Sequence, residues 1–282
     1  QAELDVSAFQ PGLKEHTLVM YAPNEKVVSA EIKFNSDISF EAFKTSVNDS
    51  AGDDKGPTGS YKYPTDASFT SQMDILKLDT ESQGSKLTMK FTMSDVSDSW
   101  KPANNFDHVS FNIYFDLPDV SGMPVLPKIS ANAPQGFEWN YGHFVFGWNN
   151  AVYTTKGADA AKWGDPASVS PGITVNKSDK TIIFTYNSND FKISNWNGVK
   201  VYVTTWDFDG VDNIYRPLLE KEEAYRFGGR TSITDPLIMD DMAVFELKGT
   251  TDPNEAVIIS GDSTVKAGET LTLSANMSVE WK

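Results

Sequence analysis

Segments in which hydrophobic and polar residues alternate recur along the chain and constrain its fold more than any other feature. The clearest covers residues 108–116, where alternate positions are hydrophobic: Val109, Phe111, Ile113 and Phe115. Because successive side chains of a strand point to opposite faces of a sheet, this period of two predicts a strand with one buried face. Further candidate strands cover 17–21, 26–34, 86–93, 181–186, 200–206 and 242–247. Gly, Pro, Asn and Asp separate the segments and no long amphipathic helix is found, so we expect an all-β fold, a β-sandwich.

The charge balance limits the kinds of partner. The chain has 39 acidic and 24 basic residues, a formal net charge of −15, and no cluster of basic residues. Nucleic acids are bound by cationic surfaces, so we expect no nucleic acid partner. No hydrophobic run is long enough to cross a bilayer, and the absence of cysteine excludes disulfides and thiolate sites. Neutral sugars and cations remain the natural partners.

Residues 49–66 form an acidic loop that is a candidate metal site. The segment contains four aspartates, three glycines and two prolines and cannot form a helix. Crowded carboxylates repel one another unless a cation or hydrogen-bond donors hold them, and hard oxygen ligands on irregular backbone suit calcium. The candidate ligands are Asp49, Asp53 and Asp54, with Asp66 and Asp74 as further members. On composition alone, a solvated acidic loop is the alternative.

The order of residues in and after this loop is similar to that of a known family. The opening run consists of Asp49, Gly52, Asp53, Asp54, Gly56, Tyr61, Tyr63, Pro64, Thr65, Asp66 and Phe69. The pattern continues with Asp74, Trp100, 109–116, Gly147, Trp148, 202–206, Arg216, Gly228, Gly229, Pro236 and Asp240. Over about residues 45–245 the chain resembles the glucodextranase C-terminal domain family. The resemblance implies a DOMON-like sandwich related to family-nine carbohydrate-binding modules, with immunoglobulin-like layering and structural calcium near the acidic loop.

The sequence also suggests how the chain is divided. We expect residues 1–248 to form the sandwich module, with residues 1–44 supplying extra strands. Residues 249–256 are polar and contain Pro253, which is typical of a linker. Residues 257–282 resemble the first strands of a bacterial immunoglobulin-like domain. Either the parent protein continues beyond this segment, or the segment pairs with the main sandwich.

Aromatic residues in loop-like surroundings are candidates for sugar binding. Sugar rings stack on aromatic side chains while neighbouring polar groups bind the hydroxyls. The segments 137–141 and 148–150 combine both kinds of residue, and Trp163 precedes Gly-Asp-Pro. The predicted carbohydrate-binding residues are therefore Trp139, Tyr141, Asn149 and Trp163. The alternative is that these tryptophans fill the core, which is the interpretation we favour for Trp148 and Trp206.

The sequence contains no catalytic motif. No G-x-S-x-G, zinc-binding or phosphate-binding pattern is present, and the three histidines are far apart, so structural roles are expected for His108 and His143. The acidic segment 207–213 begins like an EF-hand loop but lacks the required glycine and glutamate, which favours a turn at a strand end. Arg216 and Arg230 are expected to pair with buried carboxylates such as Asp207 or Asp240. We predict that the chain is not an enzyme, although its parent protein can carry a glycoside hydrolase.

These observations favour a non-catalytic carbohydrate-binding module with structural calcium, which binds neutral glucan polysaccharides or oligosaccharides. A start at Gln1 rather than methionine is expected for a secreted or cell-surface protein whose signal peptide has been removed, or for a fragment. The alternative is a structural cell-surface protein, such as an S-layer, adhesin or filament subunit, that self-associates through its terminal strands. A haem-binding DOMON domain is a third alternative, for which no methionine–histidine motif is found.

Overall fold

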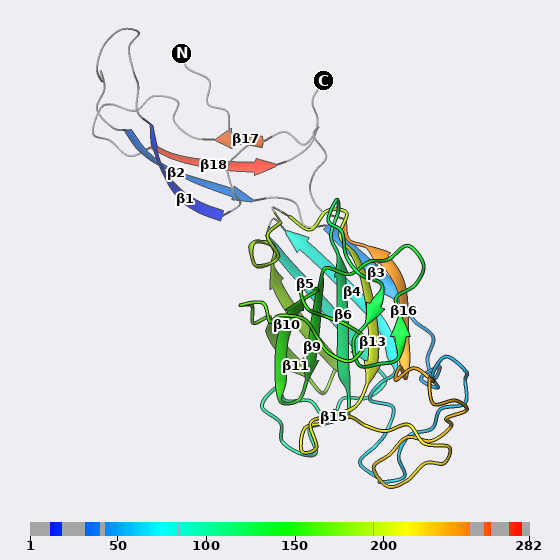
Figure 1. Ribbon diagram of the computed structural model, residues 1–282. Helices are drawn as coiled ribbons and strands as arrows, with labels where there is room; N and C mark the ends of the chain where they lie inside the picture. The colour runs from blue at the N-terminus through cyan, green and yellow to red at the C-terminus, as the bar shows by residue number, and fades with distance from the viewer. Residues whose placement is uncertain are drawn as a thin grey trace.

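Two five-stranded antiparallel sheets face each other in the protein (Figure 1). The computed structural model describes residues 43–248 except 84 and 194, together with the strands at 12–18, 32–39, 257–260 and 271–277. The all-β sandwich predicted from the alternating segments is confirmed. Among the described residues, none of the helices has the length and hydrophobicity that a membrane span requires.

The first sheet has the strand order β11-β12-β5-β4-β3. Its strands are β3 (Phe43–Asn48), β4 (Ile75–Gln83), β5 (Lys86–Met93), β11 (Gly172–Asn176) and β12 (Thr181–Asn187). The acidic loop connects β3 to β4. It therefore leaves one edge of this sheet and returns to the neighbouring strand.

The second sheet has the order β10-β9-β6-β13-β16 and carries the candidate binding site. Its strands are β6 (Ser110–Asp116), β9 (Tyr141–Phe146), β10 (Asn149–Thr154), β13 (Lys200–Trp206) and β16 (Asp240–Glu246). Two short hairpins, β7–β8 (Val125–Leu126 and Ala131–Asn132) and β14–β15 (Phe208–Asp209 and Ile214–Tyr215), and the 3-10 helix η1 (Ser188–Phe191) lie in the connections.

The core between the sheets is aromatic, and the hydrophobic positions of the alternating segment at β6 lie in it. Phe111 on β6 contacts Phe91 of β5 and Phe184 of β12, with ring centroids 5.2 and 5.5 Å apart. The opposite face of β6 is also covered, since Tyr114 is fully buried and stacks on Trp163 at 5.7 Å. β6 is therefore buried on both faces, on one by the first sheet and on the other by Trp163 from a connecting loop. The loops on this outer face contribute to the candidate binding site.

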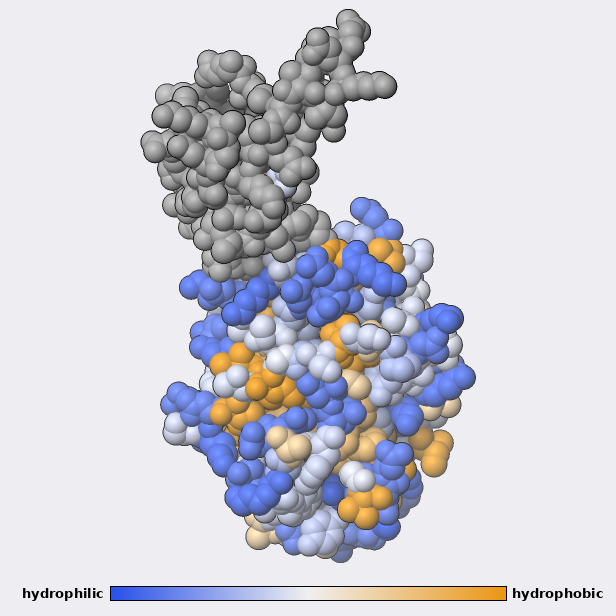
Figure 2. Space-filling view, turned by 90° about the vertical axis from the view of Figure 1, so that its left-hand side faces the viewer, coloured by the Kyte–Doolittle hydropathy of each residue, from blue (hydrophilic) through white to orange (hydrophobic). Residues whose placement is uncertain are grey.

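The outer surface of the sandwich is largely hydrophilic. Figure 2 shows one side of the molecule with mostly hydrophilic residues and smaller hydrophobic patches among them, in keeping with the net charge of −15. Exposed large hydrophobic residues are few among those described, and three of them are aromatic: Trp100, Trp148 and Tyr225. All three line one groove, described below.

Strands from both ends of the chain form a further four-stranded sheet, in the order β1-β2-β18-β17 (Figure 1). Its strands are β1 (Gly12–Leu18), β2 (Ile32–Ser39), β17 (Val257–Ser260) and β18 (Leu271–Met277). The pairing of β18 with β2 is parallel, and the other pairings are antiparallel. The predicted linker at 249–256 lies outside the described residues, and the predicted division of the chain into domains stays a prediction.

Candidate functional site

Three aspartates from distant parts of the chain meet at one end of the sandwich. Asp53 lies in the acidic loop, Asp74 precedes β4 and Asp240 begins β16, and one carboxylate oxygen from each lies within 4.8 Å of the others. Backbone hydrogen bonds hold two of them: the Gly52 N–H donates to Asp74 Oδ2 at 3.0 Å, and the Ile75 N–H donates to Asp240 Oδ2 at 2.7 Å. The three carboxylates form a candidate metal centre.

The electrostatics of this cluster favour a cation. Burial, reinforced by the charges of Asp49, Asp53 and Asp74, raises the pKa of Asp240 to about 8, although the Ile75 N–H opposes the shift. Burial is also the main cause of the raised pKa values of Asp49 and Asp74. Asp49 Oδ2 and Asp74 Oδ1 are buried without a hydrogen-bond partner. Buried oxygens without donors are costly unless a ligand satisfies them, so this donor set fits a hard cation.

The acidic loop supplies part of this cluster but not all of its predicted ligands meet there. Asp53 and Asp74 come together, and Asp49 is close enough for its charge to act on Asp240. Asp54 is buried and accepts a hydrogen bond from the Tyr63 hydroxyl at 2.6 Å. Asp66 is not one of the three clustered residues, and it accepts hydrogen bonds from Ser68 and Tyr225 instead. The predicted ligand set as a whole remains a prediction.

Asp240 is the member of the cluster that the sequence interpretation misses. The sequence suggests it as a partner for arginine, but it faces Asp53 and Asp74. The sequence feature that could have linked Asp240 to the cluster is its position in the family pattern that begins with the acidic loop. By contrast, the expected buried pair of Arg216 and Asp207 is confirmed, since Arg216 Nε donates to Asp207 Oδ2.

The glycines of the acidic loop permit its close packing, and Gly56 is the most restrictive. Gly56 has a φ of +67°, and its N–H donates to Met239 O at 2.9 Å, next to the cluster. A Cβ at this position would overlap the ring of Tyr61, whose hydroxyl donates to Pro236 O. Only glycine fits both the backbone conformation and the space.

We expect Gly56→Ala to lower the free energy of unfolding by about 2–4 kcal/mol, since overpacking adds to the cost of positive φ. Gly52→Ala is the matched control. Gly52 has a φ of +78°, but no atom lies within 4 Å of the position that an alanine methyl group would take, so only the backbone cost of about 1 kcal/mol applies. Urea unfolding measures both, and equal losses would contradict the role assigned to the Tyr61 contact.

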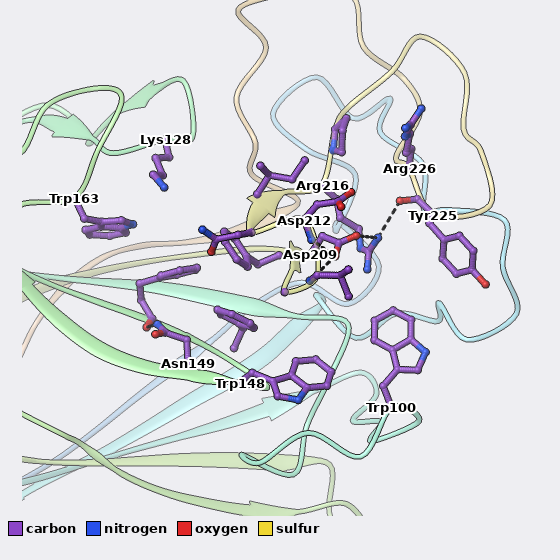
Figure 3. Close-up of a pocket in the computed structure, with 18 of the residues that line it drawn as sticks. Trp100, Lys128, Trp148, Asn149, Trp163, Asp209, Asp212, Arg216, Tyr225 and Arg226 are labelled. Atoms are coloured by element: carbon purple, nitrogen blue, oxygen red, sulfur yellow. Dashed lines mark hydrogen bonds and ion pairs between the residues drawn. The ribbon is translucent and has the colours of Figure 1, made fainter.

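A groove of about 1410 Å³ lies over the outer face of the second sheet. Figure 3 shows Trp100 and Tyr225 on one side of it, Trp163 and Lys128 on the other, and Trp148 with Asn149 along one edge. Trp100, Trp148 and Tyr225 are 38%, 49% and 49% exposed. These rings are therefore held by the fold while part of each surface faces solvent.

Buried aromatic residues and a hairpin support this groove. Phe144 and Phe146 of β9 line it together with Phe208 of β14, and Phe146 contacts Phe208 with ring centroids 4.7 Å apart. The turn between β14 and β15 is closed by Asp209, which accepts the N–H groups of Val211 and Asp212. The expected strand-end turn is thus present.

Arg216 follows this hairpin and ties it to the loops around the groove. Its Nη1 donates to Asp209 Oδ2 at 2.9 Å and to the Tyr225 carbonyl at 3.3 Å. Its guanidinium carbon also lies 5.5 Å from the ring centre of Trp100. One buried cation therefore contacts three parts of the groove.

The predicted sugar-binding residues fall into two groups. Trp163 and Asn149 line the groove, as Figure 3 shows. Trp139 is fully buried, its indole N–H donates to Val125 O at 2.8 Å, and it has no free face for stacking. Tyr141 is buried and packs on Phe191 with centroids 4.9 Å apart. Neither of these two residues belongs to the groove surface that we describe.

The expectation that Trp148 fills the core is wrong, whereas Trp206 is fully buried as expected. Trp148 lies between the end of β9 at Phe146 and the start of β10 at Asn149. Residues in such a tight turn are outside the alternation of the flanking strands. The ring is therefore free to project into the groove.

The sandwich and the aromatic groove over its second sheet are the architecture of a β-sandwich binding module. The family model described as "C-terminal binding-module, SLH-like, of glucodextranase" matches residues 45–249. Since this match covers more than half of the chain, the protein belongs to this family, and the resemblance found in the sequence is confirmed. No match was found among curated proteins.

Proposed function

We propose that this module binds neutral glucans in the aromatic groove, as part of a secreted or cell-surface protein, with calcium held by the acidic cluster. The observation that carries the proposal is the set of three partly exposed rings, Trp100, Trp148 and Tyr225, around one groove. Sugar rings stack on exposed aromatic faces, whereas the binding of a charged ligand does not require such faces. The family membership supports a role in binding rather than in catalysis.

The charges that line the groove favour a neutral ligand. The lining includes three cations and three carboxylates: Lys128, Arg216, Arg226, Asp209, Asp212 and Glu223. Two of the cations are already paired within the groove, Arg216 with Asp209 and Arg226 with Glu223. The groove is therefore balanced in a chain whose net charge is −15, and it offers no excess charge to an ionic ligand.

The residues of the acidic cluster fit calcium. Asp53, Asp74 and Asp240 offer only carboxylate oxygens, and Asp49 has a further buried oxygen without a partner. Calcium accepts six to eight oxygen ligands in a flexible geometry, with the remainder from backbone and water. A bound ion would offset the mutual repulsion of these carboxylates and would fix the acidic loop against β16.

We expect Trp100→Ala and Trp148→Ala each to weaken glucan binding about tenfold or more, because each removes a stacking surface. Titration calorimetry with a panel of soluble neutral glucans and one anionic polysaccharide measures the effect. Ile233→Ala is the control, since Ile233 is an exposed hydrophobic residue outside the groove lining. Undiminished binding by both tryptophan variants would contradict the proposed site. A chain that assembles with calcium and binds no glucan would instead favour the structural surface role.

A further inference from the structure

Asp107 and His108 follow Trp100 in the chain. Asp107 binds the Trp100 backbone, and His108 packs against the indole ring. The Trp100 backbone N–H donates to Asp107 Oδ2 at 2.6 Å, and Asp107 Oδ1 lies 2.6 Å from His108 Nδ1. The imidazole of His108 in turn lies against the indole of Trp100, with ring centroids 3.9 Å apart and a 35° angle between the planes. Both Asp107 and His108 are buried. The exposed groove ring therefore rests on a buried polar pair.

The same histidine is connected to the second exposed ring of this side of the groove. His108 Nε2 lies 2.9 Å from Ser68 Oγ, and Ser68 Oγ donates to Asp66 Oδ1 at 2.6 Å. The other oxygen of this carboxylate, Asp66 Oδ2, accepts the hydroxyl of Tyr225 at 3.0 Å. A continuous chain of hydrogen bonds therefore links Tyr225 to the pair beneath Trp100.

The direction of these hydrogen bonds distinguishes this hydrogen-bond chain from a catalytic triad. Hydrogen bonds from Ser68 and Tyr225 lower the pKa of Asp66, so this carboxylate is an acceptor only. The Ser68 hydroxyl donates its hydrogen to Asp66 Oδ1 at 2.6 Å, so this hydrogen is not directed at His108 Nε2. A hydrolytic triad needs the opposite polarity, with the serine donating to the histidine. The arrangement of Ser68, His108 and Asp107 therefore holds side chains in place and does not generate a nucleophile.

Asp107 is a charged hydrogen-bond acceptor at one end of this chain of hydrogen bonds. Burial opposes its ionisation, but hydrogen bonds from His108, Ser97 and the Trp100 backbone outweigh burial and lower its pKa. Phe69 fills the space between the two ends: its ring lies 4.6 Å from His108, 6.1 Å from Trp100 and 6.4 Å from Tyr225. The polar chain and this packed ring leave little freedom to either exposed aromatic side chain.

We propose that Asp107, His108, Ser68 and Asp66 are positioning residues that fix Trp100 and Tyr225 relative to each other before a ligand binds. The inference rests on the proposed sugar-binding function of the groove and adds the residues that set its geometry. Two rings held in place lose little conformational freedom on binding, which is how preorganisation raises affinity. Asp66, predicted from the sequence as a metal ligand, has this different role in the proposal.

Tyr225→Phe tests the inference most directly, because it keeps the ring and removes only the hydroxyl that Asp66 holds. Tyr225 is 49% exposed, so the variant keeps its fold. We expect the indole N–H resonance of Trp100, assigned with Trp100→Phe, to shift or broaden in the ligand-free variant. We expect glucan affinity to fall about three- to tenfold, since the ring is no longer fixed. Asp66→Asn should have the same two effects, and Asp179→Asn, an exposed carboxylate in the turn before β12, should have neither.

The two measurements separate this inference from the proposed function. An unchanged Trp100 resonance in both Tyr225→Phe and Asp66→Asn would overturn the inference. A loss of affinity without any change at Trp100 would also overturn it, because it would assign the Tyr225 hydroxyl to direct ligand contact. A changed Trp100 resonance in a protein that binds none of the glucans would refute the proposed function while the link between the two rings would stand.

Discussion

Arg216→Met is expected to lower the free energy of unfolding by about 3–5 kcal/mol, because it leaves the buried carboxylate of Asp207 without its partner. The side chain of Arg216 is 8% exposed and that of Asp207 is 4% exposed, so water cannot replace the lost interaction. The substitution also removes the hydrogen bonds to Asp209 and to the Tyr225 carbonyl. The measurement is urea unfolding at pH 7, and the groove should lose its glucan affinity as well.

Arg226→Met is the matched control for this prediction. Arg226 also lines the groove, but it forms an exposed ion pair with Glu223 at 3.2 Å. Exposed pairs contribute about 0–1 kcal/mol, so this variant should be nearly as stable as the wild type. Equal destabilisation by the two substitutions would contradict the structural importance of the Arg216–Asp207 pair.

The pH dependence of Arg216→Met gives a second check. Burial already raises the pKa of Asp207 even with the arginine beside it, and loss of the cation raises it further. A carboxyl group whose pKa is higher in the folded than in the unfolded state costs stability as the pH rises above its unfolded value, near 4. The deficit of the variant should therefore be small at pH 4 and grow toward neutral pH. A deficit that is constant with pH would show that lost packing, not the unpaired carboxylate, is its cause.

The sandwich was predictable because alternation is a local signal. Val109, Phe111, Ile113 and Phe115 predicted a strand over 108–116, and the structure has β6 at Ser110–Asp116. The same holds for 86–93 and 200–206, which coincide with β5 and β13. Strands with one face in a core keep their period of two whatever their partners are.

The candidate sites were predictable only in part, because they combine residues from distant segments. Asp53 and Asp74 are close in sequence and are predicted together, but Asp240 comes from β16, near the other end of the module. For the aromatic residues, exposure depends on the local chain path. Trp148 is exposed because it occupies the turn between β9 and β10, while Trp139 is buried and its backbone pairs with Met123. Neither path is encoded by the identities of the neighbouring residues alone.

No motif in the sequence predicts the chain of hydrogen bonds between Trp100 and Tyr225. Its members occur as Asp66 and Ser68 in one loop, Asp107 and His108 before β6, and Tyr225 in a third segment. Histidine was expected to have a structural role, and the structure shows what that role involves: both ring nitrogens of His108 are hydrogen-bonded. Such a network becomes visible only when three loops are brought together by the sandwich.

Asp240→Asn is expected to have opposite effects on stability with and without calcium. In the metal-free protein the pKa of Asp240 is about 8, against about 4 in the unfolded chain. Stability is therefore lost as the pH rises from about 4 through about 8, and the loss is on the order of 5 kcal/mol above pH 8. Asparagine keeps an oxygen for the Ile75 N–H but carries no charge, so the variant avoids this loss. In EDTA at pH 9 it should melt at a higher temperature than the wild type, and the two should converge near pH 4.

With calcium the order should reverse, because the ion binds the ionised carboxylates and stabilises the folded state. At a calcium concentration of about 100 to 1,000 times the dissociation constant, the wild type should gain about 3–4 kcal/mol. Asp240→Asn should gain little, because a charged ligand has been lost from the cluster of Asp53, Asp74 and Asp240. Asp179→Asn, which removes an exposed carboxylate that is not one of the three clustered residues, should respond to calcium like the wild type. If calcium raised the melting temperature of Asp240→Asn as much as that of the wild type, the ion would be bound elsewhere and the cluster would have no part in it.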